Sequence, residues 1–143
     1  MHQKISPATS VSGAIQLPGD KSISHRYGML AAIAEGESKI SNYSTGADCQ
    51  STLACMRALG AGVETKDGVV LIQGRGLDGL RQPAGALDAG NSGSTIRMLS
   101  GILAAQPFVT SIGGDESLSK RPMARIMTPL AEMGARIDAQ ENR

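Results

Sequence analysis

Apolar residues recur along this chain in two alternating patterns, one with the three-to-four-residue spacing of a helix and one with the two-residue spacing of a strand. The helical runs begin near Ser, Asp or Asn, and several end at glycine, as capped helices do. They predict four helices, at 21–35, 47–59, 92–105 and 119–133. The last contains Pro122, which a helix tolerates in its first turn.

Strand-like segments lie between these helices. The pair Asp67-Gly68 separates two of them and is a strong hairpin turn signal. A Gly-rich connection follows at 74–86, after which a helix and a strand alternate again. This order predicts an α+β fold built from α/β-type repeats. The expected strands are 15–17, 37–43, 62–66, 69–73, 108–112 and 135–139.

The two halves match as a weak internal repeat, at 18–74 and 86–143. Arg26 corresponds to Arg97, and Gly60-Ala61 corresponds to Gly134-Ala135. The second copy lacks a closing hairpin. Because that leaves an unpaired sheet edge, we expect a fragment of a longer protein.

Composition narrows the function classes. A net charge of +1 and an aromatic content of 2% argue against a nucleic-acid binder, which needs a basic surface and often stacking aromatics. No apolar run is long enough to span a membrane, and the first ten residues resemble neither a secretory signal nor a transit peptide. We therefore expect an aliphatic-cored, cytoplasmic protein. Cys49 and Cys55 match no metal or redox spacing and are expected to be reduced packing residues.

The stretch LPGDKSISHR, residues 17–26, carries the strongest chemical signal. Pro18-Gly19 predicts a turn, and Asp20 and Ser22 are good caps for the helix that follows. Lys21, Ser22 and Arg26 would then lie at the positive end of a helix dipole, next to unpaired backbone N–H groups. This combination predicts an oxyanion receptor, with phosphate as its natural ligand.

Two further helix starts repeat this chemistry. NSGSTIR, residues 91–97, places Asn91, Gly93 and Arg97 together, and the glycine lets a ligand approach the backbone. DESLSKRPM, residues 115–123, offers Arg121, whose planar guanidinium suits a carboxylate or phosphate. Simpler interpretations are helix capping for the first motif and a surface salt bridge from Arg121 to Asp115 or Glu116 for the second. Three such starts in one chain favour a shared site.

Other candidates are weaker. The Walker phosphate loop is absent, because Asp20 precedes Lys21 where that motif needs glycine, and position 15 is Ile. His25 is more consistent with a packing or surface residue than with an acid or base. Charge complementarity to the helix N-terminus is enough to explain Asp48.

Taken together and in this order, the three motifs resemble those of 5-enolpyruvylshikimate-3-phosphate synthase. The residues GDKS and SKRPM within them are similar to those of the bacterial class II branch. That family transfers the enolpyruvyl group of phosphoenolpyruvate to shikimate 3-phosphate in aromatic amino-acid biosynthesis, and it is the target of glyphosate. Its fold has two domains, each of three βαβαββ units. The resemblance implies about two units here, the second incomplete, in a partial first domain at 18–143. It also implies that 1–17 holds a strand of the other domain.

The resemblance also implies site roles. Lys21 would contact both substrates, and Ser22 and Arg26 would hold shikimate 3-phosphate. Asn91, Gly93 and Arg121 would form the phosphoenolpyruvate pocket, with Arg97 in a supporting role. No residue of this chain would act as the acid or base, so the isolated chain would be inactive without the rest of the synthase. The reaction needs no metal and no cofactor.

Two alternatives stay open. One is the related enolpyruvyl transferase that acts on UDP-N-acetylglucosamine, although Ser22 with Arg26 favours a compact sugar phosphate. The other is a non-catalytic anion-binding module of the same fold.

Overall fold

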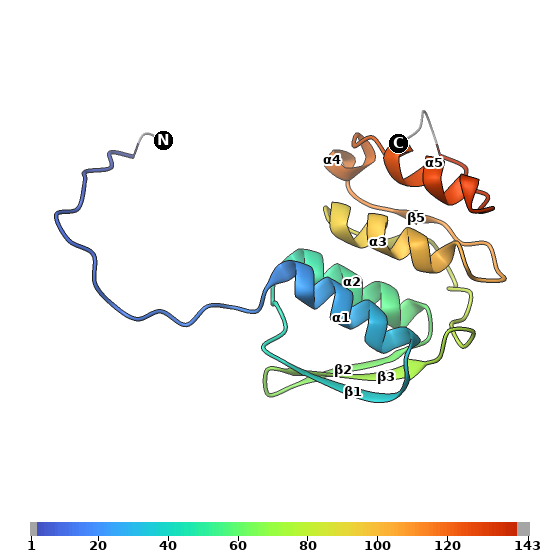
Figure 1. The fold of residues 1–143 in the computed structure, drawn as a ribbon, viewed down its shortest axis with the longest axis horizontal. Coiled ribbons are helices and arrows are strands. Elements are labelled where there is room, and N and C mark those ends of the chain that lie inside the picture. Colours follow the sequence, from blue (N-terminus) through green and yellow to red (C-terminus); the bar gives the residue numbers. More distant parts are fainter. Residues whose placement is uncertain (1–2, 140–143) are drawn as a thin grey trace.

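The computed structural model describes residues 3–139, which form a compact body and an extended N-terminal segment (Figure 1). Residues 3–20 contain no helix or strand, and the strand expected at 15–17 is not formed within this chain. The side chains of Ile15 and Leu17 are exposed, and Figure 1 shows the segment leading away from the body. These residues therefore make no contribution to the core.

The first half of the body contains five elements in the predicted order of helix, strand, helix, strand, strand. The three strands form an antiparallel sheet in the order β1-β3-β2, and α1 and α2 cover one face of it (Figure 1). The elements are α1 (Lys21–Ile33), β1 (Glu35–Ser41), α2 (Ala47–Ala58), β2 (Gly62–Lys66) and β3 (Val69–Arg75).

Local signals in the sequence explain these elements. The Asp20 side chain caps α1, with Oδ1 accepting a hydrogen bond from the Ile23 backbone N–H at 2.7 Å. Asp67 and Gly68 have positive φ angles of 50° and 75°, as the tight β2–β3 turn requires. The first helix ends two residues earlier than expected, because Glu35 already pairs with Arg75 in the sheet. Sheet pairing outweighs the helix signal there.

The core is aliphatic, as the composition predicts. It lies between the sheet and the helices and includes fully buried residues of α2, its C-cap position, β3 and α3, namely Leu53, Met56, Leu59, Ile72 and Leu99. Cys49 and Cys55 are free and buried, which agrees with the packing role expected of them. Burial raises the pKa of the Cys55 thiol to about 11, so it stays protonated at neutral pH.

The second half departs further from the expectation. Of the strand expected at 108–112, only Ile112 lies in a strand. Of the helix expected at 119–133, residues 124–132 form one helix, and a separate short helix before it ends at Ser119. Residues 135–139 form no strand, and residues 140–143 of the expected second repeat lie outside the described residues. The observed elements are β4 (Leu87–Asp88), α3 (Gly93–Leu103), β5 (Ile112–Gly113), α4 (Glu116–Ser119) and α5 (Ala124–Glu132).

Non-local contacts explain these differences. The short strands β4 and β5 pair in parallel, and no local turn signal reports such a pairing. Pro122 lies in the bend between α4 and α5, where it interrupts the helix instead of starting one. The helix α5 has no buried residue, so its apolar face is only partly covered.

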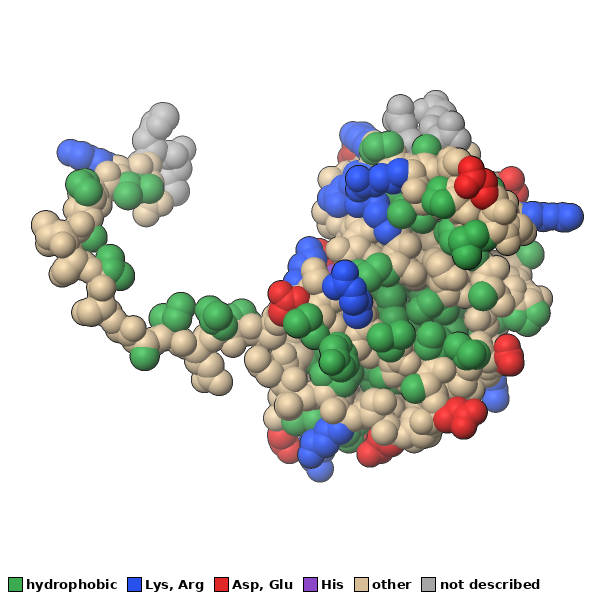
Figure 2. All heavy atoms as spheres, viewed as in Figure 1, with side chains coloured by type: hydrophobic (Ala, Val, Ile, Leu, Met, Phe, Trp, Pro, Cys, Tyr) green, Lys and Arg blue, Asp and Glu red, His purple; other side chains and the backbone are tan. Residues whose placement is uncertain are grey.

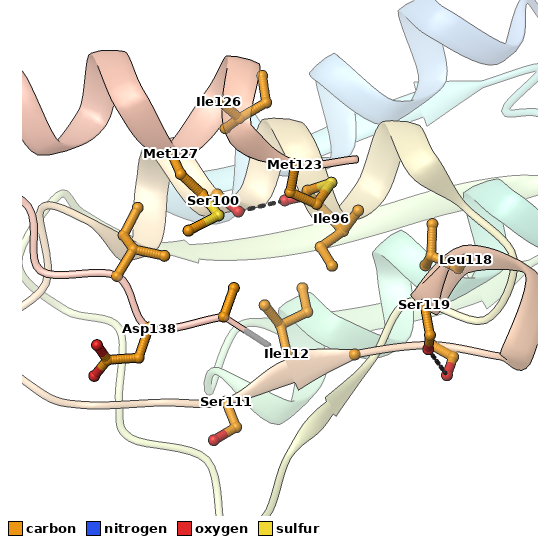
Figure 3. A pocket seen from close by; sticks show the side chains of 14 residues that line it. Ile96, Ser100, Ser111, Ile112, Leu118, Ser119, Met123, Ile126, Met127 and Asp138 are labelled. Carbon is orange, nitrogen blue, oxygen red and sulfur yellow. Dashed lines mark hydrogen bonds between the residues drawn. The ribbon is translucent and has the colours of Figure 1, made fainter. Parts of the chain in front are cut away.

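A cavity of about 940 Å³ lies beneath this half-covered helix (Figure 3). It is lined by side chains of α3, β5, α5 and the adjoining loops, among them the apolar Ile96, Ile112, Met123, Ile126 and Met127 and the polar Ser100 and Asp138. None of the anion-binding residues expected from the sequence borders it. The cavity is therefore separate from the expected anion-binding residues.

Within residues 3–139, no helix has both the length and the apolar character needed to cross a membrane.

Candidate anion-binding site

The start of α1 carries the first group of anion-binding side chains. Lys21, Ser22 and Arg26 are all exposed there, at the positive end of the helix dipole. The loop before α1 packs closely on the segment after β1. The closeness is evident at Gly19, where an added Cβ atom would overlap the Asn42 carbonyl oxygen. Only glycine fits at that point, and the close approach fixes where α1 begins.

Lys21 makes an ion pair with Asp48, which lies in the first turn of α2. The sequence explains Asp48 by its helix position alone, and the structure adds this second role. The pair holds the lysine ammonium between the starts of α1 and α2. Both side chains remain partly exposed, so the ammonium stays accessible to a ligand.

The start of α3 carries the second group. Ser92 is the N-cap residue, with Oγ accepting a hydrogen bond from the Thr95 N–H at 3.1 Å. A Cβ atom at Gly93 would lie 3.1 Å from Nη1 of Arg121 and 3.2 Å from Nη1 of Arg97. The two guanidinium groups therefore lie against the same glycine. Because Gly93 has no side chain, the space beside these groups stays open, whereas a larger residue would fill it.

A hydrogen-bond chain orients Arg121. Its Nη2 donates to Oδ1 of Asn91, and Nδ2 of Asn91 donates to Asp115 at 2.7 Å. The pKa of the Asp115 carboxyl lies below its usual range. The largest cause is the hydrogen bond from Asn91, and the next is the hydrogen bond from the Leu118 N–H. The salt bridge considered from the sequence is not formed, because Glu116 pairs with Lys120 and Asp115 binds Asn91.

Arg97 lies among positive charges. Burial lowers its pKa, and the nearby charges of Arg125 and Arg121 lower it further. Its Nε atom is buried without a hydrogen-bond partner among the described residues. Within residues 3–139, neither Arg97 nor Arg121 forms an ion pair with a carboxylate. The cluster therefore has positive charge to spare for an anion.

Arg125 is a member of this cluster that sequence reasoning did not find. It lies in the first turn of α5, four residues after Arg121. Residues four apart lie on the same face of a helix, so this spacing could have suggested that Arg125 lies near Arg121. The bend at Pro122 interrupts the helix between them, which makes that rule unreliable here.

The two groups lie on one side of the body. Figure 2 shows Lys and Arg side chains gathered along the edge where α1, α3 and α4 begin. Asp48 bridges the groups, because its side chain pairs with Lys21 and its carbonyl oxygen accepts a hydrogen bond from the Thr95 hydroxyl at 3.2 Å. The expected site residues thus lie at or near the connected starts of α1 and α3, except Arg121, which reaches Gly93 from the bend between α4 and α5 and not from a helix start.

His25 of α1 is buried where α1 packs against α2, and it does not lie on the surface. Its Nδ1 atom is 2.7 Å from Oγ1 of Thr52. Burial lowers the pKa of the ring, as does the charge of Lys21, while Asp48 opposes the shift. The ring is therefore neutral at pH 7. This burial agrees with the packing role that was one of the two expected for it.

This lowered pKa predicts a loss of stability in mild acid. Below pH 6.5 the unfolded chain binds a proton at His25 before the folded chain does, so the free energy of unfolding falls until the pH reaches the folded-state pKa. In urea unfolding between pH 7 and pH 5, the variant His25→Asn should lose less stability than the wild type. Equal losses in the two chains would contradict the lowered pKa.

Comparison with known proteins identifies the family of this chain. Residues 5–143 match the family model described as EPSP synthase (3-phosphoshikimate 1-carboxyvinyltransferase). The chain belongs to the EPSP synthase family. Among curated relatives, the 3-phosphoshikimate 1-carboxyvinyltransferase of Solibacter usitatus is 68% identical over all 143 residues, and that of Koribacter versatilis is 58% identical over 139 residues. This membership confirms the resemblance seen in the three motifs.

Solved structures of the family share the fold. The EPSP synthase from Acinetobacter baumannii aligns with 90% of this chain at a TM-score of 0.85 and 49% identity. This agreement confirms the α+β fold and the incomplete enolpyruvyl transferase architecture. The chain spans about a third of the length of these relatives, at 34% of the Solibacter protein and 29% of the Acinetobacter structure.

Proposed function

We propose that this chain supplies the opening part of an enzyme that transfers the enolpyruvyl group from phosphoenolpyruvate to shikimate 3-phosphate. The observation that carries this proposal is the cluster of arginines around Gly93, which has no carboxylate partner among the described residues. Both substrates are polyanions, and such a cluster suits them. The family membership favours this activity over transfer to a nucleotide sugar.

The start of α1 is proposed to bind shikimate 3-phosphate. Arg26 has guanidinium donors to spare, since its one hydrogen bond among the described residues is from Nη1 to the Ser22 carbonyl oxygen. The Ser22 hydroxyl and the first-turn N–H groups add neutral donors at the positive end of the dipole. Lys21, held near Asp48, would contact both substrates from this position.

The start of α3 is proposed to bind phosphoenolpyruvate. Arg121 would offer its planar fork to the phosphate or the carboxylate, with Asn91 fixing its orientation. Gly93 would let the substrate approach the backbone, and Arg97 would add positive charge beside it. Each of these groups is a donor or a cation, and none is suited to take a proton from carbon.

These positions give the chain a positioning role in the reaction. The substrate hydroxyl attacks C2 of phosphoenolpyruvate while C3 is protonated, and phosphate then leaves the tetrahedral intermediate. The described cations hold both substrates for attack and stabilise negative charge on the phosphate and carboxylate groups. Proton transfer is assigned to residues outside this chain, and the reaction uses no metal or cofactor.

The rest of a synthase-length chain is the proposed partner. It would cover the open cavity beneath α5, and a second domain would include residues 1–17 as a strand. Residues 18–143 would then be part of the first domain, with repeats at 18–74 and 86–143. A cytoplasmic location and inhibition by glyphosate belong to the same proposal.

The proposal is tested by joining this chain to the remainder of the Solibacter usitatus relative, which is 68% identical over the shared part. The joined chain is expected to release phosphate only when both substrates are present, whereas the 143-residue chain alone releases none. Product formed by the chain alone would show that the chemistry lies within these residues. A folded but inactive joined chain would contradict the proposed function.

A further inference from the structure

A chain of buried hydroxyl groups connects α1 to the start of α3. It runs from His25 through Thr52 of α2 to Thr95 and Ser92, and all four residues have no exposed surface. His25 Nδ1 lies 2.7 Å from the Thr52 hydroxyl, which lies 2.8 Å from the Thr95 hydroxyl. The Thr95 hydroxyl in turn lies 2.8 Å from that of Ser92. The chain thus ends at the N-cap residue of α3.

Proton counting, together with the missing partner at Nε2 of His25, assigns a direction to these hydrogen bonds. The Thr95 hydroxyl has one proton, which it directs to the Ser92 hydroxyl or the Asp48 carbonyl oxygen. With its proton directed there, Thr95 accepts from Thr52. Thr52 then has no proton for His25, and the short contact between them requires Nδ1 of His25 to be the donor. The opposite direction would place the ring proton on Nε2 of His25, which is buried with no hydrogen-bond partner among the described residues.

His25 is therefore a neutral ring with its proton on Nδ1. Its Nε2 atom has a free lone pair and no hydrogen-bond partner among the described residues. The charged groups that act on the ring are Lys21 and Arg26 on its own helix and Asp48 on α2. Because the two cations oppose protonation of the ring, the ring stays neutral and has a single proton, on Nδ1.

We propose that His25 is a positioning residue, whose Nδ1–H sets the position of the α3 start relative to α1 through Thr52 and Thr95. This inference rests on the proposed function, because the two helix starts are the proposed binding sites for the two substrates. Ser92 caps α3 and Gly93 follows it directly, so a shift of this turn would move the backbone that Arg97 and Arg121 flank. Small misplacements of such a site reduce binding and rate.

The ring nitrogens of His25 give the first test. After His2→Gln leaves one histidine, the ¹⁵N spectrum of the 143-residue chain at pH 7.5 should show Nδ1 protonated and Nε2 unprotonated. The opposite tautomer in the His2→Gln chain would overturn the inference without any further variant. In Thr52→Val, Nδ1 loses its acceptor, and the two ring signals should change. In Thr52→Ser, which keeps the hydroxyl, they should not.

The second test is the binding of inorganic phosphate. It is measured through the NMR signals of the Gly93 and Ser94 backbone amides. Thr52→Val is expected to weaken the phosphate response about tenfold, and Thr52→Ser is expected to restore it. A wild-type response that Thr52→Val retains would overturn the positioning role alone. A wild-type chain whose amides do not respond to phosphate would refute the positioning role, whereas the proposed function is refuted by an inactive joined chain.

Discussion

Replacing Arg121 by glutamine is expected to lower kcat/KM for phosphoenolpyruvate about 10³-fold in the joined chain. The guanidinium rests against Gly93 and is oriented by Asn91, so its loss removes a charged donor that is already in place. Glutamine keeps polarity but has neither the charge nor the planar fork. Steady-state kinetics at saturating shikimate 3-phosphate measures this effect.

Lys120→Gln is the matched control, because it removes one positive charge from the adjacent residue. Lys120 is exposed and pairs with the exposed Glu116, so it should change kcat/KM less than twofold. A similar loss in both variants would mean that general charge, and not the position of Arg121, explains the effect. An Arg121→Gln chain with wild-type kinetics would remove Arg121 from the proposed site.

Replacing Arg26 by glutamine is expected to raise KM for shikimate 3-phosphate about 10²-fold in the joined chain while leaving the fold intact. The side chain is exposed, and its one hydrogen bond is to the Ser22 carbonyl oxygen, so its removal costs little stability. The remaining guanidinium donors are the ones that a sugar phosphate would use. KM measured at saturating phosphoenolpyruvate gives the result.

Lys39→Gln provides the comparison for Arg26. Lys39 is an exposed cation on β1, in the sheet and away from the helix starts, and the change should leave KM unaltered. If Arg26→Gln kept its affinity for shikimate 3-phosphate, the interpretation of the chain as a non-catalytic module would gain support.

The elements of the first half were predictable because each has a local signal, although the pairing of β1 with β3 joins distant residues and shortened α1. Asp20 caps α1, Asp67-Gly68 closes the hairpin, and α2 ends at Ala58, one residue earlier than expected. The second half depends on contacts between distant residues. Pairing of β4 with β5 joins residues about 25 positions apart, and neither strand is long enough to show alternation in the sequence.

The candidate site was found through its charged motifs, and what escaped prediction is how the side chains are supported. The sequence placed Arg97 and Arg121 in separate motifs, whereas the structure brings both against Gly93. The Lys21–Asp48 pair and the link from Thr52 to Thr95 join residues on different helices. No spacing rule within one helix can report such contacts.

The central claim is that a binding site for shikimate 3-phosphate is already formed in this chain. A backbone-amide NMR titration of the 143-residue chain with shikimate 3-phosphate, and with shikimate as the control, tests it most directly. The amides of Lys21, Ser22 and Arg26 are expected to shift with the phosphorylated ligand and not with shikimate. A folded chain whose α1 amides do not respond, or respond equally to both ligands, would contradict it.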